Sequence, residues 1–465
     1  MEGLTQLLLP AVQTVNSYLS DYVLLFLLVG TGLFFTVKTG FIQVRCLGEG
    51  FRQVFGGLSL RGKKQQGGMS SFQALATAIA AQVGTGNIVG ASGAILLGGP
   101  GAIFWMWVIA FFGMATIYAE AVLAQKTRVR DAEGQVLGGP VYYIRAAFPG
   151  GFGRFLAGFF AVAIILALGF LGCMVQSNSI GAAFENAFGI PVWMAGAVLV
   201  VLSGFIFFGG TQRLASVTEK LVPAMAGLYL LGSLAVLAAR RQDVGEGFLM
   251  IFRYALSPQA ILGGSMGAAL KAAVSQGAKR GLFANEAGMG STPHAHALAN
   301  VKTPHQQGCV AMVGVFIGTF CIVTITALVI IVTMYAGGGP LSAPGVGVTA
   351  HELGLNQSNL AQAAYSTVFG ETLGTAFIAV ALFFFAFSTI LSWNLFGKLN
   401  AQYLWGRRAV MPYTLLSLAF LFLGTVISAD LVWGLADLFN QLMVLPNVIG
   451  LLGCAGTVKA LIRKE

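Results

Sequence analysis

The chain has 465 residues, of which 57% are hydrophobic and only 9% are charged. Globular domains carry about a quarter charged residues, so this composition excludes a soluble multidomain protein, a disordered chain, a disulfide scaffold and a collagen-like fibre. It indicates an all-α polytopic membrane protein, in which the net charge of +10 is first a signal of orientation rather than of a nucleic-acid partner.

The hydropathy pattern predicts about 11 transmembrane helices, because a helix needs about 20 mostly apolar residues to cross a bilayer. Long apolar runs favour helices over a β-barrel, whose strands would alternate in short segments. No basic stretch precedes the first run, so we expect it to be retained as an anchor. The predicted segments are 22–39, 70–97, 100–125, 154–178, 192–209, 217–238, 261–291, 307–336, 371–397, 411–428 and 431–459.

The basic residues predict the orientation of these helices. With the N-terminus outside and the C-terminus inside, 20 of the 26 Lys and Arg residues fall in inner loops, which is the positive-inside pattern. Only Arg240, Arg241 and Arg253 fall in outer loops, and three more lie in the seventh segment. We therefore expect a multi-pass protein of the cytoplasmic (inner) membrane with no nucleic-acid partner. The inner basic residues are Lys38, Arg45, Arg52, Arg61, Lys63, Lys64, Lys126, Arg128, Arg130, Arg145, Arg154, Arg213, Lys220, Lys302, Lys398, Arg407, Arg408, Lys459, Arg463 and Lys464.

Two predicted helices carry glycines and polar residues where a span is normally apolar. The second contains VGTGNIVG at 83–90, and the seventh contains GLFANEAGMGST at 281–292. Glycine weakens a helix, and irregular backbone at membrane depth persists only where it is buried in protein or lines a polar cavity. Gly86 and Gly90 also fit a GxxxG packing motif, so close helix packing is the alternative for either run alone.

Each interrupted helix begins a unit of five predicted spans. An odd number of spans gives the two units opposite orientations, and a matched pair of broken helices indicates an inverted-repeat transporter with its site at the midplane. The halves share no clear residue identity, so this repeat rests on hydropathy and on the positions of the breaks. We expect an extra N-terminal helix and a basic inner loop over 1–69, a first repeat over 70–240, and a second repeat with a C-terminal tail over 241–465.

Three stretches carry a resemblance to a known family. Residues 84–90, 98–107 and 281–291 look like the hallmarks of the bacterial and archaeal alanine/glycine:cation symporters, and the resemblance covers nearly the whole chain. It implies a leucine-transporter-like 5+5 inverted repeat after one extra N-terminal helix. It also implies sodium-driven uptake of small amino acids, chiefly alanine and glycine, by alternating access. The implied partners are the amino acid, the bilayer and the transported sodium ions, with no further cofactor.

The resemblance also implies a set of substrate contacts. Backbone amides freed at a break suit the carboxylate of an amino acid. Gln176 and Asn285 are implied to bond the amine, and Phe283 to close the pocket. Trp393 lies on the same helix face as Thr389 and would limit side-chain size. Interhelical bonding is the alternative for Gln176, and a core aromatic is the alternative for Trp393. The implied substrate residues are Thr85, Gly86, Gln176, Phe283, Asn285 and Trp393.

Sodium ligands are expected at the first break and on the ninth segment, because hard cations take oxygen ligands. The resemblance implies that Asn87 offers its amide oxygen and that Ser388 and Thr389 serve a second cation. The alternative for these hydroxyls is a bond to a carbonyl of their own helix. Freed backbone carbonyls are expected around Ala80, Gln82 and Val83.

Glu286 is a carboxylate predicted at membrane depth, which favours a functional role. It would attract the ammonium group, bind a cation or carry a proton. An ion pair with Lys279 or Arg280 is the equally weighted alternative. Glu120, near the inner end of the third segment, is expected to form a gate or a helix-end ion pair.

Other chemistry finds little support. His294, His296 and His305 fall in a predicted inner loop without accompanying thiolates or carboxylates, and the five cysteines show no CxxC spacing, so we expect no metal centre there. The run GGSMG at 263–267 matches G-x-S-x-G, but at the start of a membrane helix rather than at a strand-to-helix turn. We therefore expect no enzyme. A proton-coupled amino-acid transporter and an ion or solute channel are the remaining alternatives.

Overall fold

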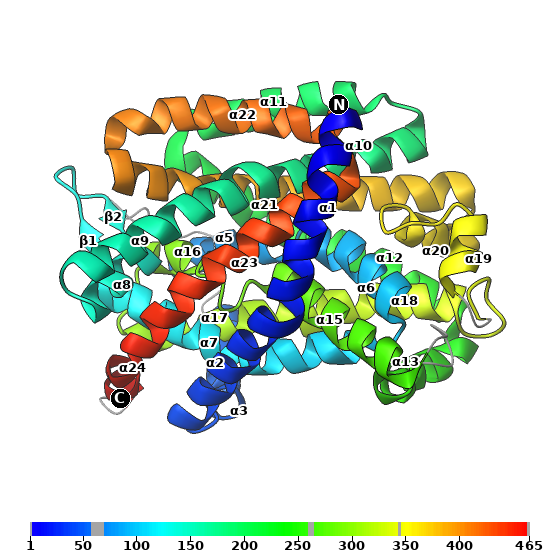
Figure 1. Cartoon of the computed structure of the whole chain (residues 1–465), viewed down its shortest axis with the longest axis horizontal. Helices are drawn as coiled ribbons and strands as arrows, with labels where there is room; N and C mark the ends of the chain where they lie inside the picture. Colours follow the sequence, from blue (N-terminus) through cyan, green and yellow to red (C-terminus); the bar gives the residue numbers. More distant parts are fainter. Residues whose placement is uncertain (1, 57–68, 259–264, 343–345, 463–465) are drawn as a thin grey trace.

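The computed structural model describes residues 2–56, 69–258, 265–342 and 346–462. These residues are almost entirely helical, apart from one antiparallel hairpin in which Val129 pairs with Leu137 (Figure 1). The first predicted glycine-rich run interrupts its helix, and the second, over 281–292, includes the last turn of α15 (Met266–Asn285) and the loop that follows it.

The N-terminal elements are α1 (Glu2–Tyr18), the π-helical stretch η1 (Leu19–Leu24), α2 (Leu25–Lys38), α3 (Ile42–Arg45), α4 (Leu47–Gly56), α5 (Ser71–Gln82), the π-helical stretch η2 (Gly86–Gly90), α6 (Ala91–Gly98) and α7 (Ala102–Thr127). The elements that follow are β1 (Val129–Arg130), β2 (Val136–Leu137), α8 (Pro140–Ala147), α9 (Gly151–Ile164), the π-helical stretch η3 (Ile165–Gly172), α10 (Cys173–Phe188), α11 (Val192–Phe207), α12 (Gly210–Ala239) and α13 (Arg241–Leu256).

The C-terminal elements are α15 (Met266–Asn285), α16 (Pro293–Leu298), α17 (Pro304–Val315), the π-helical stretch η4 (Phe316–Val323), α18 (Thr324–Met334), α19 (Val346–Glu352), α20 (Leu360–Phe369), α21 (Glu371–Trp405), the short 3-10 turn η5 (Arg407–Ala409), α22 (Val410–Val426), α23 (Ala429–Gly453) and α24 (Ala455–Ile462).

Among the described residues, seven helices are long and apolar enough to cross a membrane, or eight if the pair α5 and η2–α6, bent by 45°, is one span. These eight coincide with predicted segments. The other three predicted segments fall short for identifiable reasons. Helices α2 and α11 have only 14 and 16 residues, and α15 carries Lys271, Lys279 and Arg280. The seven long helices are Ala102–Thr127, Gly151–Phe188, Gly210–Ala239, Pro304–Met334, Glu371–Trp405, Arg407–Val426 and Ala429–Gly453.

The N-terminal region differs from the prediction, because helix begins at Glu2 rather than near residue 22. Helix α1 packs beside α23, and the two cross the face of the molecule together (Figure 1). Polar residues such as Asn16 lower the hydropathy of α1, and Asn16 Nδ2 donates to the Gly434 carbonyl of α23 at 2.8 Å. A polar residue with a partner on a neighbouring helix is therefore what hid α1 from the hydropathy pattern.

Two groups of helices lie on opposite sides of the bent helix pair. Helices α11 and α22 run side by side along one edge, whereas α7, α15 and α17 pack together on the opposite side (Figure 1). The bent pair α5 and η2–α6 lies between them, and every residue from Ala74 to Ile95 is buried. The glycine-rich break is thus held inside protein, as irregular backbone at membrane depth requires.

Loops predicted to share a membrane side also gather in space. A cavity of about 540 Å³ brings Gln135 together with residues 207–212 and with Lys398 and Arg407, all from predicted inner loops or their edges. Some predicted features lie outside the described residues: the first four positions of the seventh segment, the start of the GGSMG run, and the basic residues Arg61, Lys63, Lys64, Arg463 and Lys464.

Candidate functional site

The first break separates α5 from η2. Ser70 and Gln73 form a capping box that starts α5, and the chain leaves the helix at Val83, which has φ −111° and ψ 82°. Side chains then satisfy two freed backbone amides. The Gly84 N–H donates to Asn87 Oδ1 at 3.0 Å, and the Thr85 N–H donates to Gln176 Oε1 at 3.1 Å. The break is therefore held open by specific acceptors rather than collapsed into a continuous helix.

The second break follows Asn285, the last residue of α15. Glu286 adopts φ +57°, a left-handed conformation that residues other than glycine seldom adopt, and it ends the helix. Asn285 Oδ1 accepts the Ala287 N–H at 3.0 Å, which is the turn that asparagine favours. The loop then runs to α16. The carboxylate of Glu120 accepts the Gly290 N–H of this loop at 3.0 Å.

The two breaks face each other. Gln82 Nε2 donates to the Asn285 carbonyl at 3.0 Å. A Cβ atom on Gly86 would lie 2.9 Å from Phe283 Cδ1 and 3.2 Å from Ala284 Cα, so only glycine permits this approach. A third helix joins them, since Asn87 Nδ2 donates to the Gly318 carbonyl at 3.0 Å. Residues from α5, η2, α15 and η4 thus form one polar centre.

Four buried polar atoms at this centre have no hydrogen-bond partner among the described residues. Each belongs to a side chain that is at most 1% exposed. An unpaired buried polar group costs about 1–3 kcal/mol, so four of them at facing breaks indicate a place where a ligand supplies the partners. The atoms are Gln82 Oε1, Thr85 Oγ1, Gln176 Nε2 and Asn285 Nδ2.

A second group of oxygens lies where α21 crosses the end of α5. Thr389 Oγ1 lies 2.8 Å from the Ala80 carbonyl oxygen, and Ser388 Oγ lies 3.4 Å from the same atom. Both hydroxyls also reach the Phe385 carbonyl of their own helix, as the alternative interpretation expects. Gly84 lies directly against Thr389, where no side chain would fit. The structure therefore joins Ala80, Ser388 and Thr389, whereas Asn87 is connected to them only through Gly84.

Aromatic rings form a wall beside the breaks. The Phe283 ring lies edge-on to Trp393 with centroids 5.5 Å apart, and it lies 5.0 Å from Trp433. Gly172 makes room for Trp393, because a Cβ atom there would lie 2.6 Å from the indole ring. The sequence reasoning missed Trp433, since nothing in its local pattern separates it from other aromatic residues near a span end.

Glu286 turns toward this wall. Trp393 Nε1 donates to Glu286 Oε1 at 2.6 Å, and the Ser291 hydroxyl donates to Oε2. The alternative prediction of an ion pair with Arg280 is wrong, because Arg280 pairs with Asp437 at 3.5 Å and covers the Trp433 ring. The left-handed turn at Glu286 directs it away from the preceding helical turns.

Lys279 and Glu120 also differ from expectation. Lys279 lines a small cavity together with Asp437 rather than with Glu286. Glu120 forms no helix-end ion pair among the described residues. It accepts the Asn447 amide at 2.6 Å and the Gly288 and Gly290 N–H groups, so it anchors the second break.

A vestibule of about 550 Å³ approaches the wall from one side. Arg280, Trp433 and Asp437 line it, together with residues near 13–17, 93–97 and 350–357, which belong to predicted outer loops and helix ends. Trp433 lines this space, and its ring also contacts Phe283. The vestibule therefore reaches the aromatic wall at Trp433.

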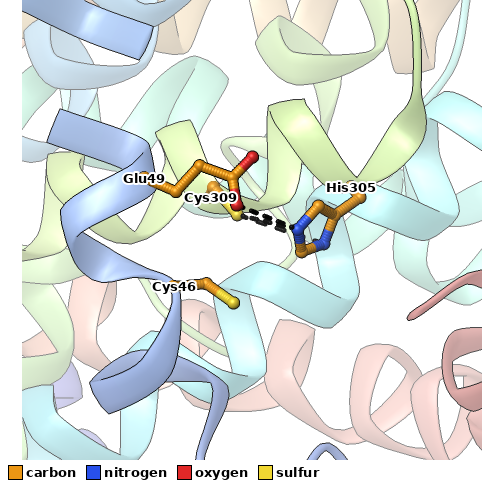
Figure 2. A group of neighbouring side chains, drawn as sticks. All are labelled: Cys46, Glu49, His305 and Cys309. Atoms are coloured by element: carbon orange, nitrogen blue, oxygen red, sulfur yellow. Dashed lines mark hydrogen bonds and ion pairs between the residues drawn. The ribbon is translucent and has the colours of Figure 1, made fainter. Parts of the chain in front are cut away.

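The histidines separate into two environments. His294 Nε2 contacts Asn400 Nδ2 at 2.8 Å, and His296 Nδ1 contacts Gln307 Nε2 at 2.7 Å. Among the described residues, neither belongs to a cluster of potential metal ligands. His305 instead lies with Cys46, Glu49 and Cys309 (Figure 2). The prediction that no thiolate or carboxylate accompanies the histidines is wrong for this residue, because Cys309 lies one turn along the same helix and Cys46 and Glu49 come from a distant part of the chain.

Comparisons with known proteins agree with this architecture. The profile described as "Sodium:alanine symporter family" matches residues 5–464. The chain is 39% identical to the sodium/alanine symporter AgcS of Methanococcus maripaludis, over 96% of this chain and 95% of that protein. It is 40% identical to the putative sodium/proton-dependent alanine carrier protein YrbD of Bacillus subtilis, over 95% and 89%.

A similar fold occurs among solved structures. A mutant of the Eremococcus coleocola manganese transporter superposes with a TM-score of 0.55 at 14% identity, over 82% of this chain and 78% of that one. At this level of identity the likeness concerns the fold alone. The two chains thus share a similar helical fold.

Proposed function

Because the chain belongs to the sodium:alanine symporter family, we propose that it couples sodium influx to the uptake of alanine and glycine by alternating access. The protein is a multi-pass membrane transporter by its family and its apolar helices. The proposal concerns its substrate, its coupling ion and its direction. It rests on one observation above all: the four unpartnered polar atoms between the facing breaks.

These atoms match the two ends of a zwitterionic amino acid. Gln176 Oε1 already accepts the Thr85 N–H, so its free Nε2 is a donor, as is the free Nδ2 of Asn285. Two N–H donors suit a carboxylate, whereas the free oxygens of Gln82 and Thr85 suit an ammonium group. We therefore assign Gln176 and Asn285 to the carboxylate rather than to the amine that the resemblance implied.

Sodium would bind the oxygens next to this site. The Ala80 carbonyl with Ser388 and Thr389 supplies three neutral oxygens, a donor set that hard cations accept. The carbonyls of Gln82 and Val83 would be further ligands. Asn87 would serve a second ion beside the substrate. Gly84 separates the two positions, so an ion at either one would fix the break that carries the amino-acid site.

The aromatic wall favours a small substrate. Phe283, Trp393 and Trp433 occupy the space where a long side chain would extend, and Gly172 lets Trp393 lie close to α10. Trp433 lines the vestibule and contacts Phe283, which lies against Gly86 at the first break. We infer that these rings close over alanine or glycine from the vestibule side.

We extend the proposal to the whole fold. The eight spans, with the bent pair counted as one, would make eleven helices together with α2, α11 and α15. These would be arranged as a 5+5 inverted repeat over 70–240 and 241–465 after one extra helix. The N-terminus would lie outside and the C-terminus inside the cytoplasmic membrane, since basic residues then face inward. The vestibule would open outward.

Proton coupling is the second candidate, because the B. subtilis relative is named as sodium/proton-dependent. A carrier of protons needs a titrating group that exchanges with water. Glu286 instead has both oxygens engaged by Trp393 and Ser291 and is fully buried, which favours a structural role in this conformation. A channel is less favoured, because the helix pair that carries the first break is buried inside the protein over residues 74–95.

Equilibrium binding tests the substrate assignment. Purified protein in detergent is titrated with radiolabelled alanine in sodium chloride and, separately, in choline chloride. Saturable binding that requires sodium supports the proposal. Equal binding in both salts contradicts sodium coupling, and the absence of alanine and glycine binding in folded protein contradicts the substrate.

A further inference from the structure

Four potential metal ligands from two distant parts of the chain converge beside α7. Cys46 follows α3, Glu49 lies in the first turn of α4, and His305 and Cys309 lie four residues apart on one face of α17 (Figure 2). Their ligand atoms all lie within 4.8 Å of one another. The two helices approach closely because Gly50 packs directly on the Cys309 backbone.

The distances resemble the edges of a coordination tetrahedron. Zinc binds sulfur at about 2.3 Å and nitrogen or oxygen at about 2.0–2.2 Å, so neighbouring ligands in a tetrahedral site lie about 3.3–3.8 Å apart. His305 Nε2 lies 3.5 Å from Glu49 Oε2 and 3.5 Å from Cys309 Sγ. One imidazole nitrogen therefore already has two further ligands at the required spacing.

The other ring nitrogen of His305 forms a hydrogen bond of its own. Its Nδ1 lies 2.6 Å from the hydroxyl of Tyr118, a fully buried residue of α7. Histidine ligands of metals commonly use their second nitrogen in such a bond, which fixes the ring and directs the other nitrogen at the ion. Glu49 is held in a similar way, since Gln53 Nε2 donates to its Oε1 at 2.8 Å.

We propose that Cys46, Glu49, His305 and Cys309 form a four-coordinate zinc site that clamps α4 onto α17. Two sulfurs, one imidazole and one carboxylate suit zinc, whereas magnesium, calcium and sodium prefer oxygen ligands alone. The site is separate from the two breaks and does not depend on the proposed transport function. It reaches them through α17 and η4, because Gly314 lies against Gln82 and the Gly318 carbonyl accepts Asn87. A bound ion would restrain the span that contacts the first break.

Cobalt substitution tests the site directly. Full-length protein in detergent is stripped with a chelator and titrated with Co²⁺ under reducing conditions. The expected spectrum has thiolate-to-cobalt charge-transfer bands and the intense visible bands of a tetrahedral site, both removed by about one equivalent of Zn²⁺. Hydrogen exchange over residues 47–56 should slow when zinc is added. A spectrum without charge-transfer bands would overturn the proposal.

Variants assign the ligands. Cys46→Ser, which alters a half-buried thiol, and Cys309→Ser should each weaken the charge-transfer bands and lower zinc affinity by at least about 10-fold, as should Tyr118→Phe through the lost support of His305. Cys321→Ser is the matched control, because that half-buried thiol lies outside the cluster, and it should bind as the parent does. Unchanged zinc affinity in both cluster variants, or an oxidised Cys46–Cys309 pair in protein that binds no zinc under reducing conditions, would contradict the site.

Discussion

The Thr85 backbone N–H donates to the Gln176 side-chain oxygen at 3.1 Å, so α10 holds the first break through a single amide. This bond determines which atom of Gln176 remains for a ligand. Its Nε2 is buried and has no partner among the described residues. In the proposed site Gln176 would therefore donate to the substrate, while its oxygen supports the broken backbone.

Gln176→Glu separates these two functions. The new carboxylate still accepts the Thr85 N–H, but it removes the Nε2 donor and repels a substrate carboxylate. A hydrogen bond to a charged group contributes about 1.5–3 kcal/mol, so KM for alanine should rise by about 10- to 100-fold or more. Uptake kinetics measure this, with size-exclusion profiles as the control for folding. An unchanged KM would remove Gln176 from the substrate site.

Two glycines of η2 provide a matched steric test. Gly86→Ala puts a methyl group 2.9 Å from Phe283 Cδ1, so the facing breaks must move apart and uptake should fall at least about 10-fold, as a small misplacement at a site can cause. Gly90→Ala meets nothing closer than 3.8 Å and should retain uptake. Equal activity in the two variants would contradict the close contact between the breaks.

Hydroxyls on α21 provide a second matched pair, for the cation. Thr389→Val removes the oxygen beside the Ala80 carbonyl at nearly constant shape, and it should raise the sodium concentration for half-maximal uptake by about 10-fold, the effect of about 1.4 kcal/mol. Ser392→Ala removes a hydroxyl that donates to the Thr77 carbonyl at 2.9 Å, one turn from the proposed ion. Its sodium dependence should match that of the parent. A similar shift in both variants would indicate a general packing effect.

The Trp393–Glu286 bond predicts a loss of stability. Trp393→Phe keeps an aromatic ring but leaves Glu286 Oε1 without its donor, and an unsatisfied buried acceptor costs about 1–3 kcal/mol. The thermal melting midpoint should therefore fall. Trp405→Phe, at the exposed end of the same helix, should leave it unchanged. If Trp393→Phe has the same melting midpoint as the parent, the indole does not stabilise Glu286.

The breaks could be predicted from local sequence patterns because the residues of the breaks themselves disfavour helix. The glycines at 84–90 and the polar run at 285–292 disfavour helix wherever they occur, and α5 and α15 end at these runs. The same glycines also predicted a polar site inside the protein. Thr85, Asn87 and Asn285 lie on or beside the breaks themselves, so their place in the structure follows from the sequence, while their binding roles stay a prediction.

What the sequence could not provide depends on contacts between distant helices. Trp433 contacts Phe283, and Asp437 forms an ion pair with Arg280, because side chains of α23 meet those of α15. The role of Gln176 depends on which of its two amide atoms Thr85 uses. Cys46 and His305 lie more than two hundred residues apart, so no spacing rule connects them.

Uptake into proteoliposomes under imposed gradients tests the central claim most directly. Purified protein is reconstituted, and radiolabelled alanine accumulation is followed with an inward sodium gradient, an inward proton gradient, or neither. We predict accumulation above equilibrium only with the sodium gradient, and its loss when an ionophore dissipates that gradient. Accumulation that follows the proton gradient alone, or equilibration that ignores both gradients, would contradict sodium-coupled symport.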